Sequence, residues 1–253
     1  MKNFRKKIRS AFTYQMGKKD LFIGMVEGTG ILMLTAWLFF DSLFAVIFLL
    51  PYMVIHLKKR EKTIKEKETE RISMQFKDGM LAISASLGAG YSVENAFREA
   101  IKELENLYGT KAFMAEELRK IVRKIDLNEN VEDALEKMAE EIELEDAIYF
   151  AQVFRFAKRS GGNLMEIIGK TAGIISDKLG VQEDIRVLIS GKKMEQKIMN
   201  FMPFGIIAYM RMGAYEFISP MYGNPAGVCA MIICLGLYLA ALTLSDKIVQ
   251  IKV

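Results

Sequence analysis

Acidic side chains form the densest group of residues in this chain that could do chemistry. Ten of them fall between Asp126 and Asp146, where Lys137 is the single base. The candidates for binding a partner in this run are Glu132, Asp133, Glu136, Glu140 and Glu143. A carboxylate face of this kind speeds and orients the association of a basic surface. A solvated helix face kept away from anionic lipid is the alternative, and both interpretations stay open.

The same carboxylates allow a further hypothesis, a divalent-cation site. Glu132, Glu136 and Glu140 recur every four residues, so one face of a helix would carry all three. Carboxylate oxygens are ligands that Ca²⁺ takes. We expect no metal and no cofactor in this protein, and keep this cation site as an alternative.

No catalytic residue is predicted. His56 is the only histidine, and the chain lacks the phosphate-binding Gly-x-x-x-x-Gly-Lys loop, the Gly-x-Ser-x-Gly elbow and the His-Glu-x-x-His pair. The two cysteines, Cys229 and Cys234, offer neither a disulfide framework nor a paired metal-ligand motif. We expect both to be small core residues of a non-enzymatic protein.

Glu27 and Arg211 are charged residues inside segments that are otherwise apolar. A third charged residue, Glu216, lies close to the outer edge of its segment and is expected to snorkel. A charge inside a bilayer costs on the order of 2.5 to 3.5 kcal/mol by insertion scales, so it normally finds a partner. Gly24 and Gly28 flank Glu27, and their four-residue spacing lets another helix approach closely. We expect Glu27 to be satisfied across such a contact, within the chain or between subunits. For Glu27 and Arg211 the alternatives are a polar contact with a partner's span, an internal pair between spans, and snorkelling.

The segments around these charges are long enough to cross a membrane. The chain combines 51% hydrophobic with 26% charged residues, a mixture that one soluble globule would average out. Four apolar segments stand out: Leu21–Phe40, Leu43–Leu57, Ile198–Ile218 and Gly227–Leu244. At about 1.5 Å per helical residue, such segments span the roughly 30 Å of a bilayer's hydrocarbon core. We predict an all-α integral membrane protein with four transmembrane helices in two hairpins, residues 21–57 and 198–244.

Positive charge predicts the orientation of these spans. Lysine and arginine crowd the leader, residues 1–20, and both ends of the central region, whereas the stretch 219–226 is uncharged. By the positive-inside rule, both termini, the central domain 58–197 and the tail 245–253 face the cytoplasm of a prokaryotic cell. Topology thereby explains the net charge of +4, and no nucleic-acid partner is expected.

The central domain is predicted to be helical throughout. It contains no proline, and its apolar residues recur at spacings of three and four. Six helices are expected, at about 71–87, 93–108, 112–125, 131–142, 144–158 and from 163 onward. The short turns between them allow one six-helix cytoplasmic bundle. The charged segment 60–71 is expected to continue the second span as a helical stalk.

Small residues mark the ends of these helices. Gly88 or Gly90 can adopt the left-handed conformation of a C-terminal cap, and Ser92 can cap the next helix. Gly161 and Gly162 separate the fifth helix from the sixth. We expect all five residues to shape turns rather than to bind a ligand.

The sixth helix is expected to reach the membrane as one rod. Only four glycines interrupt strong helix formers in residues 163–197, and a rod of that length would extend roughly 50 Å. It could carry a tilt of the bundle into the third span. Pro203 would absorb the bend, because proline removes a helical hydrogen bond.

Three stretches of the central domain, taken in order, resemble a known family. They are Leu87–Ser92 followed by Ala96 and Phe97, then Asn130–Leu135, then Ser160–Leu164 followed by Ile167 and Ile168. Together they resemble the type II secretion system F domain, particularly the TadB and TadC platform proteins of tight-adherence pili, from about Phe76 to Leu188. This chain has one such domain where larger secretion relatives have two. That favours the TadB or TadC type and implies a second copy from a partner or another subunit.

The resemblance implies a non-enzymatic platform in the inner membrane. Such a platform receives motion from a cytoplasmic hexameric ATPase and passes it to pilin subunits leaving the bilayer. The implied partners are that ATPase, for which the acidic run would be the docking face, a second F-domain protein or a second copy, pilins and lipid. The missing phosphate-binding loop agrees with an external source of energy.

Two other functional classes are compatible with the same helices. A small transporter or channel should line a path at the midplane with several polar groups, and only Glu27 and Arg211 are candidates. A membrane-tethered signalling scaffold would share the architecture without needing a pilin or an ATPase. The platform is the predicted function.

Overall fold

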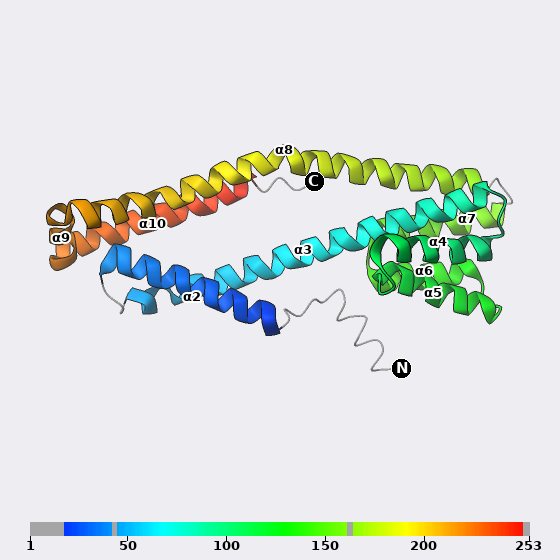
Figure 1. Cartoon of the computed structure of the whole chain (residues 1–253), viewed down its shortest axis with the longest axis horizontal. Coiled ribbons are helices and arrows are strands. Elements are labelled where there is room, and N and C mark those ends of the chain that lie inside the picture. Colours follow the sequence, from blue (N-terminus) through cyan, green and yellow to red (C-terminus); the bar gives the residue numbers. More distant parts are fainter. Residues whose placement is uncertain (1–17, 42–44, 161–163, 250–253) are drawn as a thin grey trace. The chain divides into compact units, whose positions relative to one another are not determined.

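A computed structural model describes residues 18–41, 45–160 and 164–249 of the chain, and within these ranges every element is an α-helix. The prediction of an all-α protein is confirmed for this part of the chain. The helices, labelled as in Figure 1, are α2 (Lys18–Phe40), α3 (Ala45–Gly88), α4 (Val93–Tyr108), α5 (Phe113–Asp126), α6 (Val131–Ile142), α7 (Glu145–Ser160), α8 (Leu164–Gly213), α9 (Tyr215–Gly223) and α10 (Pro225–Val249). Most of the predicted leader, and Gly161 and Gly162, lie outside the described residues.

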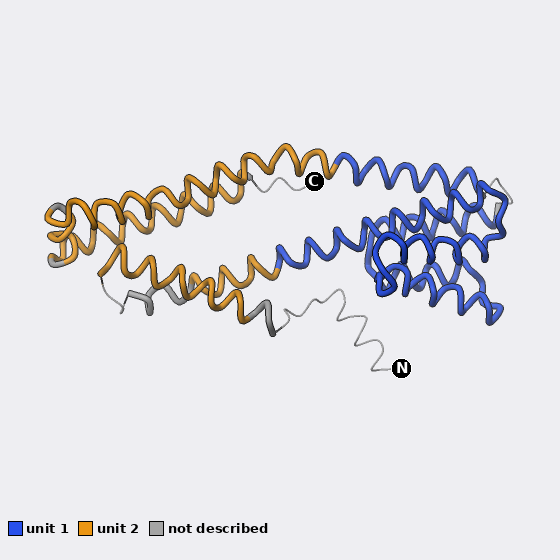
Figure 2. The backbone as a smooth tube through the Cα atoms, viewed as in Figure 1, with its two compact units in different colours: residues 1–15, 62–181 blue, residues 16–61, 182–253 orange. Residues whose placement is uncertain are grey.

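The chain divides into two compact units (Figure 2). Among the described residues, the first unit comprises 62–181, and the second comprises 18–61 and 182–249. Helices α3 and α8 each run from one unit into the other. Compactness does not locate a membrane surface, so the predicted limits of the cytoplasmic domain, 58–197, stay a prediction.

The first unit is a bundle of six helices: the second half of α3, then α4, α5, α6, α7 and the first turns of α8. Phenylalanine side chains fill its centre. Phe76 meets Phe150 edge-on with ring centroids 5.9 Å apart, and Phe97 meets Phe154 in the same way at 6.4 Å. All four rings are fully buried, and aromatic pairs of this geometry add about 0.5–1.5 kcal/mol beyond area burial.

Short turns of defined conformation separate the bundle helices. Gly90 has φ +87° and follows the end of α3, and the Ser92 hydroxyl accepts a hydrogen bond from the Asn95 amide at the start of α4. Gly109, at φ +85°, ends α4. Asn128 and Glu143 also adopt positive φ, next to the ends of α5 and α6. These residues set the directions in which successive helices leave their turns.

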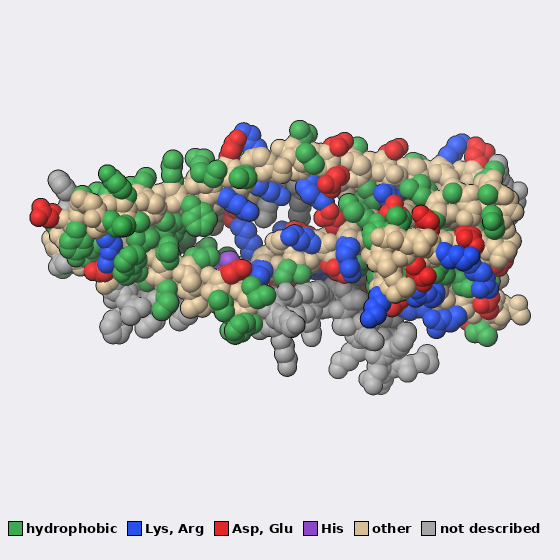
Figure 3. Space-filling model, viewed as in Figure 1, with side chains coloured by type: hydrophobic (Ala, Val, Ile, Leu, Met, Phe, Trp, Pro, Cys, Tyr) green, Lys and Arg blue, Asp and Glu red, His purple; other side chains and the backbone are tan. Residues whose placement is uncertain are grey.

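The second unit contains α2, the first part of α3, the second part of α8, α9 and α10. Its buried apolar core is small: Leu32, Ala36, Leu38, Phe39, Met231 and Leu235. Large apolar side chains point outward instead, and Figure 3 shows them gathered over α8, α9 and α10. An apolar exterior of this kind is typical of helices solvated by lipid.

Two helices in the described residues are long and apolar enough to cross a membrane, Phe22–Phe40 and Pro225–Ile248. Four transmembrane helices are therefore not shown. The predicted second segment, 43–57, begins outside the described residues. The predicted third segment, Ile198–Ile218, is divided between two helices, because α8 ends at Gly213 and Ala214, with φ −144° and ψ 48°, separates it from α9.

The uncharged stretch 219–226 is largely helical. Helix α9 continues to Gly223, and α10 begins at Pro225. Proline suits the first position of a helix, where its missing N–H leaves no bond unmade. The Asn224 side chain accepts a hydrogen bond from the Ala226 amide at 3.4 Å, which caps the same end.

The prediction that both cysteines are core residues is wrong. Cys229 and Cys234 are exposed on α10. Helix α10 turns a different face, which bears Met231 and Leu235, toward the interior of the second unit. The apolar composition of α10 does not distinguish these faces, because lipid accepts apolar side chains on the outside.

Candidate functional site

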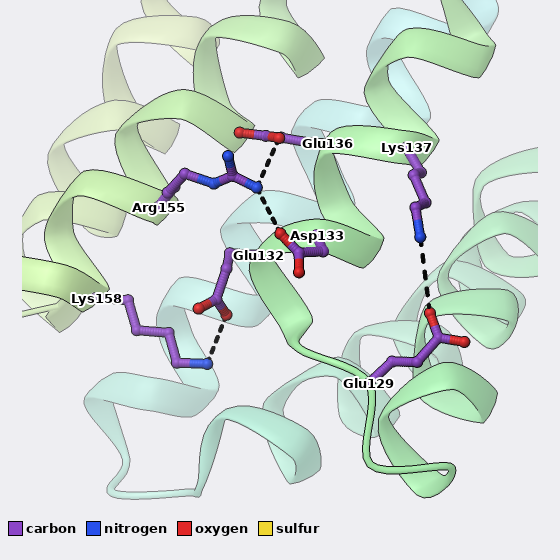
Figure 4. Close-up of polar contacts among 7 residues, drawn as sticks. All are labelled: Glu129, Glu132, Asp133, Glu136, Lys137, Arg155 and Lys158. Atoms are coloured by element: carbon purple, nitrogen blue, oxygen red, sulfur yellow. Dashed lines mark hydrogen bonds and ion pairs between the residues drawn. The ribbon is translucent and has the colours of Figure 1, made fainter.

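The acidic run divides into an inner and an outer part on α6 and the turns beside it. In the inner part, Glu132 accepts a hydrogen bond from Lys158 at 2.6 Å. The Arg155 guanidinium lies between Asp133, at 2.6 Å, and Glu136, at 2.7 Å (Figure 4). Both bases belong to α7, which packs beside α6. Three of the five candidate docking carboxylates are thus neutralised within the bundle.

Electrostatics at Glu132 reflect this pairing. Burial acts to raise the pKa of Glu132, but the hydrogen bond from Lys158, a backbone hydrogen bond and the charges of Lys158 and Arg155 together lower that pKa below its ordinary value. The carboxylate is therefore held ionised against its base. A salt bridge with one partner this enclosed is an internal tie between α6 and α7 rather than a free docking group.

The outer part of the run carries the unpaired charge. Glu140 and Glu143 are exposed, as are Glu141 and Glu145, and none of the four forms an ion pair within the described part of the chain. Asp146, by contrast, pairs with Lys178 at 2.6 Å. We name Glu140, Glu141, Glu143 and Glu145 the outer acidic patch.

The cation-site alternative finds no support in this geometry. Glu132 and Glu136 are each bound to a different base of α7. Within the described ranges, no group of three histidine, cysteine, aspartate or glutamate side chains is placed to hold a metal ion.

In the second unit, Glu27 forms an ion pair with Arg60 across the contact between α2 and α3. The two glycines on either side of Glu27 make this contact close. A Cβ atom at Gly24 would lie 3.1 Å from Leu57, and one at Gly28 would lie 2.4 Å from the Met53 sulfur. The charge is satisfied where the helices approach most closely.

Arg211 of α8 is enclosed by groups from α2 and α9. It forms an ion pair with Asp41, donates a hydrogen bond to the Trp37 carbonyl at 2.5 Å and lies 4.4 Å from the centre of the Trp37 ring. The Tyr222 ring lies 5.5 Å away on the other side, and its hydroxyl donates to the Leu38 carbonyl at 2.6 Å. Arg211 therefore joins the two hairpins of the second unit.

A third polar contact joins α3, α8 and α10. Asp246 accepts from Lys59 at 2.5 Å and from the Gln196 side-chain amide at 3.0 Å. Tyr238 of α10 donates to the Asn200 carbonyl of α8 at 2.7 Å. The helices of this unit are thus pinned by polar groups at several points.

Helix α8 is continuous for 50 residues, from Leu164 to Gly213. No loop interrupts residues 180–191, and Pro203 lies inside the helix without ending it. A single helix thus leads from the bundle into the apolar second unit.

Residues 80–210 match the family described as type II secretion system (T2SS), protein F. The match covers just over half of the chain. This chain belongs to the protein F family. No curated protein and no solved structure gives a match.

The protein F match places the site residues in context. It begins in α3 at Met80, covers α4–α7 with the whole acidic run, and ends in α8 at Met210. Proteins of the family are non-catalytic membrane platform components of secretion and pilus systems, which work with secretion ATPases and other platform proteins. Together with the two apolar helices, membership indicates a protein of the inner membrane.

Sequence reasoning missed the partners of the charges that it singled out. Arg60, which pairs with Glu27, and Asp41, which pairs with Arg211, carry no local sign of these pairings. Arg155 and Lys158, at three-residue spacing in the last turns of α7, were the available sign that the acidic run had a basic neighbour. No local pattern distinguishes Asp246 from a solvated residue of the tail.

Proposed function

We propose that this protein F-family member is a platform subunit of a Tad-type pilus or type II secretion machine, of the TadB or TadC type. It couples a cytoplasmic hexameric ATPase to the extraction and assembly of pilin subunits. In this proposal four helices cross the inner membrane, with the second part of α3 and the start of α8 leading into the cytoplasmic bundle, and both termini are cytoplasmic. A second F-domain subunit or a second copy completes the platform.

The proposal depends most on one observation about α8, most of which lies within the family match. The matched residues run from the bundle into the apolar unit along this one helix. A continuous helix transmits a rotation or tilt over its length, at about 1.5 Å per residue. The protein itself has no phosphate-binding loop, so the motion must originate in a partner.

The outer acidic patch is the proposed docking surface for the ATPase. Its four carboxylates are exposed and without ion pairs among the described residues, whereas Glu132, Asp133 and Glu136 are occupied by α7. Unpaired surface charge raises the rate at which an oppositely charged surface associates. Within the acidic run, we therefore propose Glu140, Glu143 and their exposed neighbours as the docking residues.

Co-purification from native membranes tests the partner. The full chain should carry a secretion ATPase with it, and Glu140→Lys with Glu143→Lys should weaken that association and its dependence on salt. Asp177→Lys with Asp184→Lys makes the same change in net charge on exposed residues of α8 and should leave association unchanged. If both variants lose association with the ATPase equally, the effect comes from overall charge and not from the outer acidic patch.

A second experiment tests the transmission of force. Val187 and Leu188 are 61% and 77% exposed on α8, so replacing them costs little packing. Replacing both with glycine weakens the helix by about 1 kcal/mol per residue relative to alanine. The glycine variant should lose pilus assembly while keeping membrane insertion and ATPase binding, and the alanine variant should keep all three. Normal piliation in the glycine variant contradicts a stiff α8.

A further inference from the structure

A groove of about 550 Å³ lies on the bundle where the end of α3 meets α4. Small residues line it, among them Ala82 and Ala85 of α3 and Ala89 of the turn that follows. Leu107, 57% exposed, and Tyr91 stand beside them on the α4 side. Exposed apolar groups gathered in a hollow are typical of a surface that binds another segment of protein.

Acidic side chains surround this groove. Asp78 is engaged by Lys77 at 3.0 Å and by the Tyr108 hydroxyl, which donates to it at 2.5 Å. Burial, with that hydrogen bond and the charge of Asp78, raises the pKa of Tyr108 to about 12. Glu99 pairs with Lys102 of its own helix, and Glu103 has no ion pair among the described residues. The groove therefore suits an occupant that is apolar on one side and basic on the other.

The leader of this chain, residues 1–17, has that composition. It contains five bases and no acid: Lys2, Arg5, Lys6, Lys7 and Arg9. Phe4, Ile8 and Phe12 recur every four residues, so a helical leader would carry them on one face. The leader thus combines an apolar stripe with a concentrated positive charge.

The length of the chain permits the leader to reach the groove. Gly24 lies beside Arg60, whereas Gly28 lies beside Met53, so α2 and α3 are antiparallel. The leader therefore leaves α2 at the end of the hairpin where α3 continues. Residues 60 to 82 of α3 extend at most about 33 Å, at 1.5 Å per residue. Residues 13–17, if extended, span about 17 Å, and a helix of residues 1–12 adds about 18 Å, so together they can cover that distance.

We propose that residues 1–17 bind in cis to the groove between α3 and α4. Phe4, Ile8 and Phe12 pack on its small residues and on Leu107. The bases of the leader meet Glu103 and Glu99. Occupancy covers the apolar surface, and it holds the leader away from the anionic lipid that a basic amphipathic segment would otherwise bind.

Photo-crosslinking of the full chain in nanodiscs that contain anionic lipid tests this contact. With p-benzoylphenylalanine in place of Phe12, the crosslinked peptides should map to residues 81–107. Glu99→Lys with Glu103→Lys should reduce that product several-fold, because like charge then faces the leader. Glu94→Lys with Glu116→Lys makes the same change in net charge on exposed residues outside the groove lining and should leave the yield unchanged.

A leader variant provides a second measurement that leaves the bundle sequence intact. Arg5→Glu with Lys6→Glu and Lys7→Glu should also lower the yield, and a mixture of isotopically heavy and light chains should give crosslinks within one chain. Crosslinks to lipid, to another region, or mainly between heavy and light chains overturn the proposal. So does a yield that none of these charge reversals changes.

Discussion

The bundle and the second unit place the same kinds of residues in opposite ways. We call the second unit the membrane unit because it contains both helices long and apolar enough to cross a membrane. In the bundle, phenylalanines such as Phe97 and Phe154 are fully buried and ion pairs such as Arg98–Asp126 lie on the exposed surface. In the second unit, large apolar residues face outward, with Met212 89% exposed, while Arg211 reaches inward between helices.

This contrast is the one expected for a bundle surrounded by water and for apolar helices surrounded by lipid. Water expels apolar surface, so burial of aromatic rings holds the bundle together. Lipid is as apolar as a leucine side chain and provides no such force, so close packing and polar contacts must hold the membrane helices. Removing one aromatic ring should therefore lower stability most in the bundle. Disturbing a close helix contact, or removing a polar contact between helices, should lower stability most in the other unit.

The largest expected effect tests the aromatic core. Phe154→Ala should lower the free energy of unfolding of the bundle by about 3–5 kcal/mol, the usual cost of truncating a buried phenylalanine. Phe156→Ala, two residues along the same helix but 71% exposed, should cost less than about 0.5 kcal/mol. Hydrogen exchange of the α4–α7 amides in the full chain measures both. Equal costs would deny that the bundle is held by its core.

Close packing in the membrane unit is the next test. A Cβ atom at Gly227 would lie 2.6 Å from the backbone of Met221, whereas one at Gly236 meets nothing within 4 Å. Gly227→Ala should therefore destabilise the contact between α9 and α10 by about 1–3 kcal/mol, as overpacking does. Gly236→Ala should be neutral or slightly stabilising. Detergent-induced unfolding of the two variants measures the difference. An unchanged stability of Gly227→Ala would contradict close packing between α9 and α10.

A smaller effect compares ion pairs in the two units. Arg211→Ala removes an ion pair, a hydrogen bond and two ring contacts at once, and should cost about 1–2 kcal/mol. Arg98→Ala breaks a pair whose side chains are both nearly half exposed, and should cost less than about 0.5 kcal/mol. The unfolding of each unit in its own variant is the measurement. If Arg98→Ala cost more than Arg211→Ala, polar contacts between the helices of the membrane unit would be no more important than surface ion pairs of the bundle.

The smallest effect depends on pH. Because the pKa of Glu132 is lowered on folding, its pair with Lys158 stabilises the bundle above the ordinary glutamate pKa of about 4.3, and this contribution is lost as pH falls through the lowered value. At pH 7 the free energy of unfolding of the wild type should exceed that of Glu132→Gln by up to about 1 kcal/mol, and the two values should converge in acid. Glu140→Gln, exposed and unpaired within the described residues, should show no such convergence. If the free energies of unfolding of the wild type and of Glu132→Gln differ by the same amount at every pH, the pairing with Lys158 is contradicted.

The helices of the bundle could be predicted from the sequence nearly to the residue. Predicted limits of 93–108 and 131–142 coincide with α4 and α6, and those of 112–125 differ from α5 by one residue at each end. The signals are local: Ser92 caps a helix, Gly109 and Asn128 take positive φ, and apolar residues repeat with the period of a helix. Each can be recognised without knowing what the helix packs against.

The membrane unit shows where such signals stop. The apolar run 198–218 gave no sign that α8 ends at Gly213, and apolar composition placed Cys229 and Cys234 inside when they are exposed. In lipid both faces of a helix can be apolar, so hydropathy does not report which side meets another helix.

Local sequence patterns are enough to predict that the described residues are helical, where the bundle helices begin and end, and which charges need partners. The partners themselves depend on tertiary packing: Arg155 for Asp133 and Glu136, Arg60 for Glu27, and Asp41 for Arg211. Tertiary packing also leaves Glu140 and Glu143 unpaired among the described residues. Helix propensity and capping act between residues within one turn of each other, whereas an ion pair depends on how two helices separated in sequence are packed.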